Sequence, residues 1–272
     1  MNKWDKLEAL KSMLEEKGRV AVAFSGGVDS TFLLKVAHDT LGDDAIAITA
    51  NSQLIPRREY DEAAGFCSDE GIVHEVINVD ALHIDGLSDN PKDRCYICKK
   101  AIFTRMLEIA GDRQIEYVLE GSNVDDLGDY RPGLKAIDEL GIISPLREAG
   151  LYKDEIRMLS QELGLPTWEK PSFACLASRV PYYEKITTEK LHMVEAAENI
   201  LIKMGFAQMR VRIHEGNIAR IEVLPEDIEM LVQEKNRNKI TEEFRKLGFT
   251  YTTIDLQGYR CGSLNETLTY KS

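Results

Sequence analysis

The stretch that decides the fold is Val20-Ala21-Val22-Ala23-Phe24-Ser25-Gly26-Gly27-Val28-Asp29-Ser30. An apolar run typical of a strand leads directly into two glycines, and we expect a helix to follow from about Asp29 to Leu41. Glycine lets the backbone approach an anion closely, and the first N–H groups of a helix favour negative charge. The pattern therefore predicts a cradle for pyrophosphate, and with it the cleavage of ATP between its α and β phosphates.

The same glycines could form a plain turn that only joins strand to helix. The hydroxyls of Ser25, Ser30 and Thr31, together with the acidic Asp29, favour the anion site over that interpretation. The Gly-x-x-x-x-Gly-Lys pattern is absent and no lysine follows the glycines, which disfavours transfer of the γ-phosphate.

A second polar motif, Glu120-Gly121-Ser122-Asn123-Val124-Asp125-Asp126, follows the short apolar run 117–119. Because the carboxyl ends of parallel strands meet at one edge of a sheet, we expect both motifs to face the same crevice. Magnesium usually takes one or two carboxylates together with phosphate oxygens, so Asp126 and Asp29 are candidate ligands. Asp29 is equally well suited to cap the helix that begins there.

Helical and strand patterns alternate through the first part of the chain. Helical spacing occurs at 4–14, 32–41, 60–67, 102–109 and 151–165, and strand-like runs at 19–24, 45–50, 72–79 and 117–119. Such alternation predicts an α/β fold, with a doubly wound parallel sheet in residues 1–166. The sequence predicts an irregular loop at 167–186, and at 187–272 a second, smaller α+β domain with strands at 208–213, 218–223 and 250–256 and helices at 187–204, 227–232 and 240–247.

Composition narrows the class of protein. The 272 residues are 43% hydrophobic and carry a net charge of −12, nearly all of it in residues 1–186, because residues 187–272 hold 12 Lys and Arg against 13 Asp and Glu. Neither part offers the basic surface that nucleic acid needs, which favours a small-molecule substrate. Apolar runs are far shorter than the roughly 18–20 residues that span a bilayer, and the N-terminal residues lack a secretory pattern. We therefore expect a cytoplasmic protein with no nucleic-acid or membrane partner.

Five cysteines in a cytoplasmic protein do not suggest a disulfide scaffold. Cys95 and Cys98 are spaced to share one face near the start of a helix, and Cys175 stands in a loop next to prolines. If the three meet, they suit a [4Fe–4S] cluster with one open iron. A structural zinc site and a redox pair remain alternatives. We expect Cys67 to pack in the core, and Cys261 to fill core or loop.

The sequence resembles known enzymes at several places. Ser25-Gly26-Gly27-x-Asp29-Ser30 is similar to the PP-loop of ATP pyrophosphatases such as GMP synthetase, which adenylate an oxygen of their substrate. Over nearly the whole chain the motifs resemble the LarE family of ATP-dependent sulfur insertases: 129–136, Ser178-Arg179 with Pro181-Tyr182, Val211-Arg212, 218–222, and Gly258-Tyr259-Arg260-x-Gly262-x-x-Asn265-x-Thr267-Leu268.

The resemblance implies that the carboxylates of pyridinium-3,5-biscarboxylic acid mononucleotide are adenylated and converted to thiocarboxylates, for the nickel-pincer nucleotide of lactate racemase. It implies ATP and Mg²⁺ as cofactors and a homo-oligomer, a hexamer in the best-known members. A sulfur donor and a downstream nickel-inserting protein are possible partners. The ATP-binding residues it implies are Ala23, Ser25, Gly26, Gly27, Val28, Asp29, Ser30, Asn51, Ser52 and Gly121.

Four residues are candidate ligands for the phosphate of the mononucleotide, since guanidinium groups bind phosphate in a bidentate manner. They are Ser178, Arg179, Arg210 and Arg212, and for each arginine the alternative is a surface ion pair. Glu198 and Glu222 resemble acidic positions near the family's active site, although we expect ordinary solvated glutamates there.

One departure from the family concerns the sulfur source. The best-known members sacrifice the sulfur of a single cysteine, and that position is Ala174 here, one residue before Cys175. Those members also lack cysteines at positions 95 and 98. The chain therefore resembles a three-cysteine subgroup with a [4Fe–4S] cluster on Cys95, Cys98 and Cys175, which would supply sulfur catalytically.

Two other classes of function remain open from the sequence. A PP-loop tRNA thiolase with a three-cysteine cluster would account for the two strand-end motifs, but not for the acidic composition or the C-terminal motif. A non-catalytic nucleotide-binding protein with a structural zinc site would account for the cysteines without any sulfur transfer.

Overall fold

The computed structural model describes residues 2–128, 132–171 and 174–266. It forms two compact units. Unit 1 comprises Met1–Asp80 and Asp93–Phe173, and unit 2 comprises Ala81–Lys92 and Ala174–Ser272. The short segment 81–92 thus belongs to unit 2 although it interrupts unit 1 in the sequence. The division predicted at residues 166 and 186 stays a prediction.

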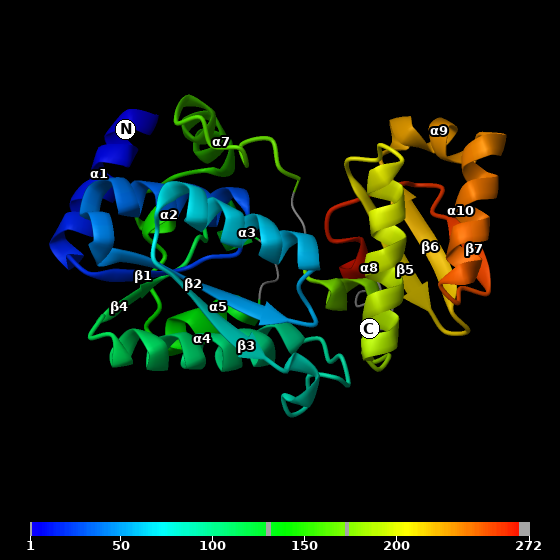
Figure 1. Ribbon diagram of the computed structural model, residues 1–272, viewed down its shortest axis with the longest axis horizontal. Coiled ribbons are helices and arrows are strands. Elements are labelled where there is room, and N and C mark those ends of the chain that lie inside the picture. The colour runs from blue at the N-terminus through cyan, green and yellow to red at the C-terminus, as the bar shows by residue number, and fades with distance from the viewer. Residues whose placement is uncertain (1, 129–131, 172–173, 267–272) are drawn as a thin grey trace. The chain divides into compact units, whose positions relative to one another are not determined.

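A four-stranded parallel sheet in the order β3-β2-β1-β4 forms the centre of unit 1 (Figure 1). The strands are β1 (Val20–Ala23), β2 (Ala45–Ser52), β3 (His74–Val79) and β4 (Tyr117–Leu119). From β1 the chain winds outward through β2 to β3 and then returns to the other side of β1 for β4. In such sheets a ligand binds where the winding reverses, which here is the edge between the ends of β1 and β4.

Helices cover both faces of this sheet because its strands are apolar on both. Val20 and Val22 pack into one core cluster with Phe32 of α2, whereas Ala21 belongs to a second cluster with Phe103 of α4. In Figure 1, α1, α2 and α3 lie on one side of the sheet, and α4 and α5 lie on the other. The helices of unit 1 are α1 (Lys3–Lys17), α2 (Val28–Leu41), α3 (Arg57–Glu70), α4 (Arg94–Asp112), α5 (Pro132–Glu139), α6 (Pro145–Glu148) and α7 (Lys153–Glu162).

Unit 2 contains a three-stranded mixed sheet in the order β5-β6-β7. The strands β5 (Met209–His214) and β6 (Ile218–Val223) pair antiparallel, and β7 (Tyr251–Ile254) joins β6 in parallel. The helices are α8 (Thr188–Lys203), α9 (Ile228–Val232) and α10 (Glu234–Lys246). The apolar faces of α8 and α10 are buried through residues such as Leu201 and Phe244, so this unit has a hydrophobic core of its own.

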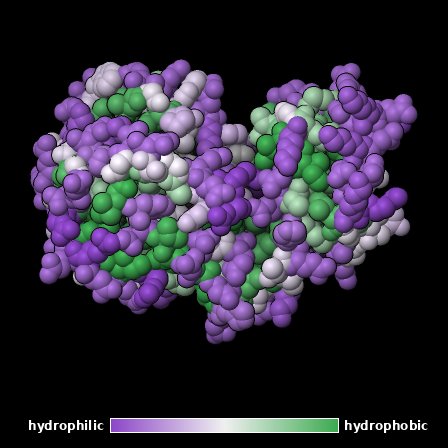
Figure 2. Space-filling model, in the orientation of Figure 1, coloured by the Kyte–Doolittle hydropathy of each residue, from purple (hydrophilic) through white to green (hydrophobic). Residues whose placement is uncertain are grey.

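The predicted fold class, a parallel α/β sheet with a smaller α+β part, is confirmed. Strands 117–119 and 218–223 have the predicted bounds, and most predicted helices are present but longer. The helices predicted at 151–165, 187–204 and 227–232 are shorter, at Lys153–Glu162, Thr188–Lys203 and Ile228–Val232. The sequence pattern does not predict α5 and α6. Hydrophilic residues cover much of the visible face of each unit (Figure 2). Among the described residues, no helix is both long and apolar enough to cross a membrane.

Candidate active site

The first motif forms a tight loop between β1 and α2, as predicted. Gly26 has φ +69°, a left-handed conformation that suits glycine, and Gly27 precedes the first residue of the helix. The Ser30 hydroxyl lies 3.1 Å from that of Ser25 and accepts a 3.3 Å hydrogen bond from the Ser25 N–H. These contacts wrap the loop over the start of α2, where the helix leaves its first N–H groups without intrahelical partners.

A buried hydroxyl in the first turn of α2 adds to the polar character of this site. Thr31 is fully buried, and its Oγ1 has no hydrogen-bond partner among the residues that the structure describes. A buried polar atom without a partner is costly, which is consistent with a ligand or water completing the site. The first turn of α2 thus holds an unpaired buried hydroxyl in addition to its backbone N–H groups.

The loop that follows β4 lies directly against the start of α2. A Cβ on Gly121 would lie 3.0 Å from the backbone nitrogen of Ser30 and 3.3 Å from the carbonyl carbon of Asp29, so only glycine fits this approach. The Asn123 side chain donates a 3.1 Å hydrogen bond to Asp29 Oδ1. The structure therefore brings the two strand-end motifs together at the edge where the winding of the sheet reverses.

The candidate magnesium ligands Asp29 and Asp126 are both connected to Asn123. Asp126 accepts a 2.9 Å hydrogen bond from the Asn123 N–H, while Asp29 also forms a close ion pair with Lys153 of α7. Among the described residues, no group of three or more His, Cys, Asp or Glu side chains is arranged to hold a metal ion. Asp29 and Asp126 are carboxylates of the type that magnesium prefers, and the phosphates of ATP would have to supply further oxygens. Their role stays a prediction.

Asn51 and Ser52 end strand β2, at the same edge of the sheet as the PP-loop. The Asn51 side chain donates a 2.8 Å hydrogen bond to Asn78 Oδ1, and the Ser52 hydroxyl accepts one of 3.3 Å from the Leu54 N–H. Both residues are partly exposed, so they are accessible to a ligand. Their assignment to an adenine pocket stays a prediction.

In unit 2, the four candidate phosphate ligands lie close together. Arg179 Nη1 donates to the Ser178 hydroxyl at 2.8 Å, and Arg212 Nη1 donates to the Ser178 carbonyl oxygen at 2.5 Å. Arg210 stacks over the Tyr259 ring at 5.1 Å. Burial, and then the neighbouring Arg179, lower the pKa of Arg210 to about 10. Guanidinium groups thus gather around Ser178, and two of them have a glutamate partner.

These arginines do not form surface ion pairs, because all three are buried. The expectation that Glu198 and Glu222 are solvated is wrong: both are fully buried. Glu198 binds Arg179, and Glu222 binds Arg212 through two hydrogen bonds of 3.0 and 2.9 Å. A buried charge is stable only when it is paired, and each of these glutamates supplies the opposite charge for its buried arginine.

The cysteines divide between the two units. Cys95 is exposed in the first turn of α4, and Cys98 is half-buried about one turn further along the same face. In unit 2, the exposed Cys175 precedes the turn Leu176–Arg179. Cys67 is buried and belongs to the core, as predicted. Cys261 is exposed, which excludes a core position for it.

Sequence comparison identifies the family. No protein-family model matches the chain. A protein of Lactiplantibacillus plantarum, named pyridinium-3,5-bisthiocarboxylic acid mononucleotide synthase, is 40% identical over 266 residues, which cover 97% of this chain and 95% of that protein. The chain belongs to this synthase family.

Two further relatives are similar to the chain. An uncharacterized protein of Synechocystis is 44% identical over 264 residues, covering 97% of this chain and 98% of that protein. A component of the glutamine-hydrolyzing GMP synthase of Thermoplasma acidophilum is 29% identical over 212 residues, covering 72% of this chain and 67% of that protein. The resemblance to the LarE family and to PP-loop enzymes is therefore confirmed, whereas the three-cysteine subgroup stays a prediction. Motif residues 129–131 and 267–268 lie outside the described residues.

Two lysines of this synthase-family member lie at the PP-loop and were not predicted. Lys153 pairs with Asp29, and Lys170 donates a 2.9 Å hydrogen bond to the Gly26 carbonyl oxygen. The lysines lie 124 and 144 residues beyond their partners in the sequence. A single lysine carries no periodic or spacing signal, so only the folded arrangement identifies these two.

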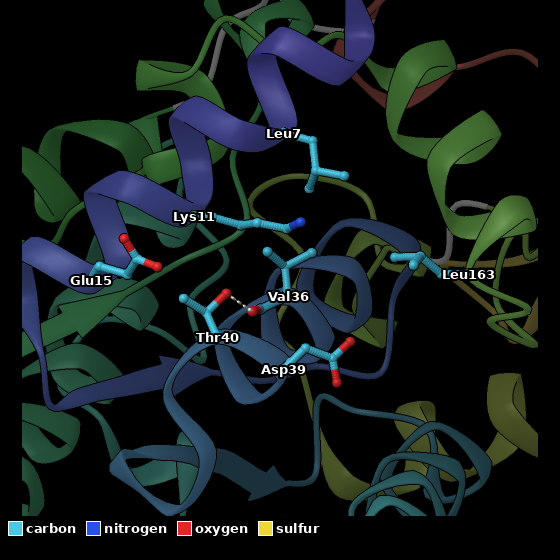
Figure 3. Close-up of a pocket in the computed structure, with 7 residues that line it drawn as sticks. All are labelled: Leu7, Lys11, Glu15, Val36, Asp39, Thr40 and Leu163. Atoms are coloured by element: carbon cyan, nitrogen blue, oxygen red, sulfur yellow. Dashed lines mark hydrogen bonds between the residues drawn. The ribbon is translucent and has the colours of Figure 1, made fainter.

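A groove on the outer helices of unit 1 is distinct from the PP-loop site (Figure 3). Leu7, Lys11 and Glu15 of α1, Val36, Asp39 and Thr40 of α2, and Leu163 just after α7 line this groove. The three α2 residues belong to the last turns of that helix, whereas the PP-loop precedes its first turn. None of the groove residues is a predicted site residue.

Proposed function

We propose that this chain is an ATP-dependent sulfur insertase that converts the carboxylates of pyridinium-3,5-biscarboxylic acid mononucleotide to thiocarboxylates, for the nickel-pincer nucleotide of lactate racemase. The observation that carries the proposal is the 40% identity over nearly the full length of both chains to the synthase of that bisthiocarboxylic product. The PP-loop between β1 and α2 and the arginine-rich site around Ser178 support the proposal, because the enzyme has to bind both a nucleoside triphosphate and a mononucleotide.

In the proposed reaction, an oxygen of the substrate carboxylate attacks the α-phosphorus of ATP and pyrophosphate leaves. The Gly26-Gly27 loop and the N–H groups at the start of α2 would stabilise the charge that develops on the departing pyrophosphate. Asp29 and Asp126 would hold magnesium on the phosphates. A sulfur nucleophile then attacks the carbonyl carbon of the acyl-adenylate, and AMP leaves with the oxygen.

The substrate phosphate would bind near Ser178, with Arg210 and Arg212 as the charged groups. Arg179 already has other partners, since its Nη1 donates to the Ala174 carbonyl oxygen at 2.8 Å and to the Ser178 hydroxyl. Arg179 would have to exchange these partners to contact a phosphate, and Arg212 would likewise have to release a donor that now binds Glu222, Ser263 or the Ser178 carbonyl oxygen. We therefore propose that Arg179 mainly orders the turn that carries Ser178.

For the sulfur source we propose Cys95, Cys98 and Cys175 as ligands of a [4Fe–4S] cluster. The exposure of Cys95 and Cys175 suits thiolate ligands, and so does the position of Cys95 in the first turn of a helix, which favours negative charge. When bound, a cluster with three protein ligands offers one open iron for an additional sulfide.

The test is a reaction of the anaerobically purified protein with ATP, magnesium, sulfide and pyridinium-3,5-biscarboxylic acid mononucleotide. We expect pyrophosphate and AMP to form only when the mononucleotide is present, together with a product in which sulfur has replaced oxygen by mass spectrometry. A protein that releases no pyrophosphate with this substrate, or that releases it equally with bulk tRNA, would contradict the proposal.

A further inference from the structure

The Lys170 ammonium is held at the PP-loop by three oxygen atoms. It donates to the Gly26 carbonyl oxygen at 2.9 Å and pairs with Glu59 Oε2 at 2.7 Å and Glu62 Oε2 at 2.6 Å. Its side chain is only 12% exposed. An ammonium group has three protons, so three acceptors use its full donor capacity. Lys170 therefore has no donor left for a ligand, and its contacts suit a residue that positions its neighbours.

The Gly26 carbonyl determines where the next N–H points. In a planar trans peptide the carbonyl and the following N–H point in opposite directions, so fixing the Gly26 oxygen also fixes the Gly27 N–H. Gly26 has φ +69°, and glycine tolerates many backbone conformations, so this peptide would otherwise rotate easily. A charge-assisted hydrogen bond from Lys170 holds it on the side away from the Gly27 N–H.

Helix α3 supports the same peptide from behind. A Cβ on Gly26 would lie 3.2 Å from the Ala63 Cβ and 3.3 Å from the Glu59 carbonyl oxygen, so the helix packs directly against the loop. Glu59, which pairs with Lys170, is buried. The loop, the lysine and the helix therefore form one closed set of contacts.

The backbone of Lys170 is fixed as well. Arg157 of α7 donates from Nη2 to the Lys170 carbonyl oxygen at 2.9 Å and from Nη1 to that of Trp168. Both ends of the lysine are thus attached to unit 1.

We propose that Lys170 is a positioning residue that holds the Gly26–Gly27 peptide in the orientation that binds pyrophosphate. The inference rests on the proposed function in that it assigns the PP-loop to the departing pyrophosphate of ATP. Lys170 acts through the peptide and does not itself contact the phosphate.

The test compares the affinities of pyrophosphate and adenosine, each measured with magnesium by competition against labelled ATP. The matched control is Lys6→Met, because Lys6 is also 12% exposed and also pairs with a glutamate, Glu155, away from the loop. We expect Lys170→Met to weaken pyrophosphate binding about tenfold, the effect of losing one charge-assisted hydrogen bond, and to leave adenosine binding unchanged. Lys170→Arg should restore binding to within about threefold, since it can still donate.

Equal pyrophosphate affinity in Lys170→Met and Lys6→Met would overturn the inference, and so would a parallel loss of pyrophosphate and adenosine binding, which indicates general disruption. If Lys170→Met does not fold, Lys170→Gln replaces it with the same expectation. The measurement needs no sulfur transfer. If pyrophosphate affinity depends on Lys170 but the chain makes no thiocarboxylate, the proposed function is contradicted and this inference stands.

Discussion

Arg179 and Glu198 form a bidentate ion pair in which neither side chain is exposed to solvent. Nε and Nη2 of Arg179 donate to the two carboxylate oxygens at 2.8 and 2.9 Å. Glu198 also accepts a 3.0 Å hydrogen bond from the Val211 N–H, while Arg179 Nη1 donates to the Cys175 carbonyl oxygen at 3.3 Å. One buried pair thus connects α8, β5 and the turn that begins after Cys175.

Removal of the glutamate should destabilise the protein strongly. Glu198→Ala leaves the Arg179 guanidinium buried without its carboxylate, and we expect the free energy of unfolding to fall by about 3–5 kcal/mol. Urea unfolding followed by circular dichroism measures the change. Glu189→Ala is the control, because Glu189 is exposed in the first turn of the same helix and should cost less than about 1 kcal/mol. Equal losses in the two variants would show that the buried pair contributes little.

The same pair predicts a dependence of stability on pH. Burial alone would raise the pKa of Glu198, but the charge and hydrogen bonds of Arg179 lower it below its ordinary value of 4.5. The unfolded chain therefore binds a proton more readily, and the stabilisation is lost as pH falls below about 4.5. We expect the difference in unfolding free energy between the wild type and Glu198→Gln to shrink over that range. A difference that stays constant from neutral to acidic pH would rule out this linkage.

Gly121 should be essential for nucleotide binding because backbone atoms surround it. In Gly121→Ala the new methyl group would meet Ser30 N at 3.0 Å and Ser30 Cα at 3.2 Å, neither of which can move without shifting α2. We expect a loss of about 1–3 kcal/mol in stability and at least a tenfold rise in the KM for ATP. Gly65→Ala in the middle of α3 is the control, since nothing lies within 4 Å of its added Cβ. That variant should gain up to about 1 kcal/mol and keep its KM.

The sequence predicts the sheet of unit 1 well because its strands are short, apolar and bounded by glycine or polar residues. Tyr117–Leu119 and the PP-loop follow from local pattern alone. The short helices α5 and α6 cannot be predicted in this way, because eight and four residues are too few to establish a helical period.

The site is predictable only where a motif is continuous. Ser25 to Ser30 form one local unit, so their side chains and backbone act together as expected. The sequence also predicts Arg179 and Arg212 as charged groups of one site, but their burial and their glutamate partners depend on packing between α8, β5 and β6. Tertiary contacts, which no local pattern encodes, decide whether a charged residue is solvated or buried.

Reactivity should separate the buried cysteine from the exposed ones. Burial raises the pKa of Cys67 to about 12, so at pH 8 Cys67 is a protonated thiol within the hydrophobic core. We expect iodoacetamide at pH 8 to modify Cys261 in the native protein and to modify Cys67 only after unfolding in urea. Peptide mass spectrometry of both samples gives the result. Native-state modification of Cys67 at a rate similar to that of Cys261 would contradict its position in the core.

Iron content tests the proposed cysteine ligands directly. If Cys95, Cys98 and Cys175 hold a cluster, each change to alanine should remove most of the iron and sulfide bound after anaerobic purification, because two thiolates hold a cluster poorly. Cys261→Ala is the matched control, since Cys261 is also exposed but lies outside the proposed set, and it should keep its iron. Bound zinc in place of iron, lost in the same three variants, would favour a structural site. Unchanged metal content in all four variants would show that these cysteines do not act together, and the sulfur source would then have to be sought outside them.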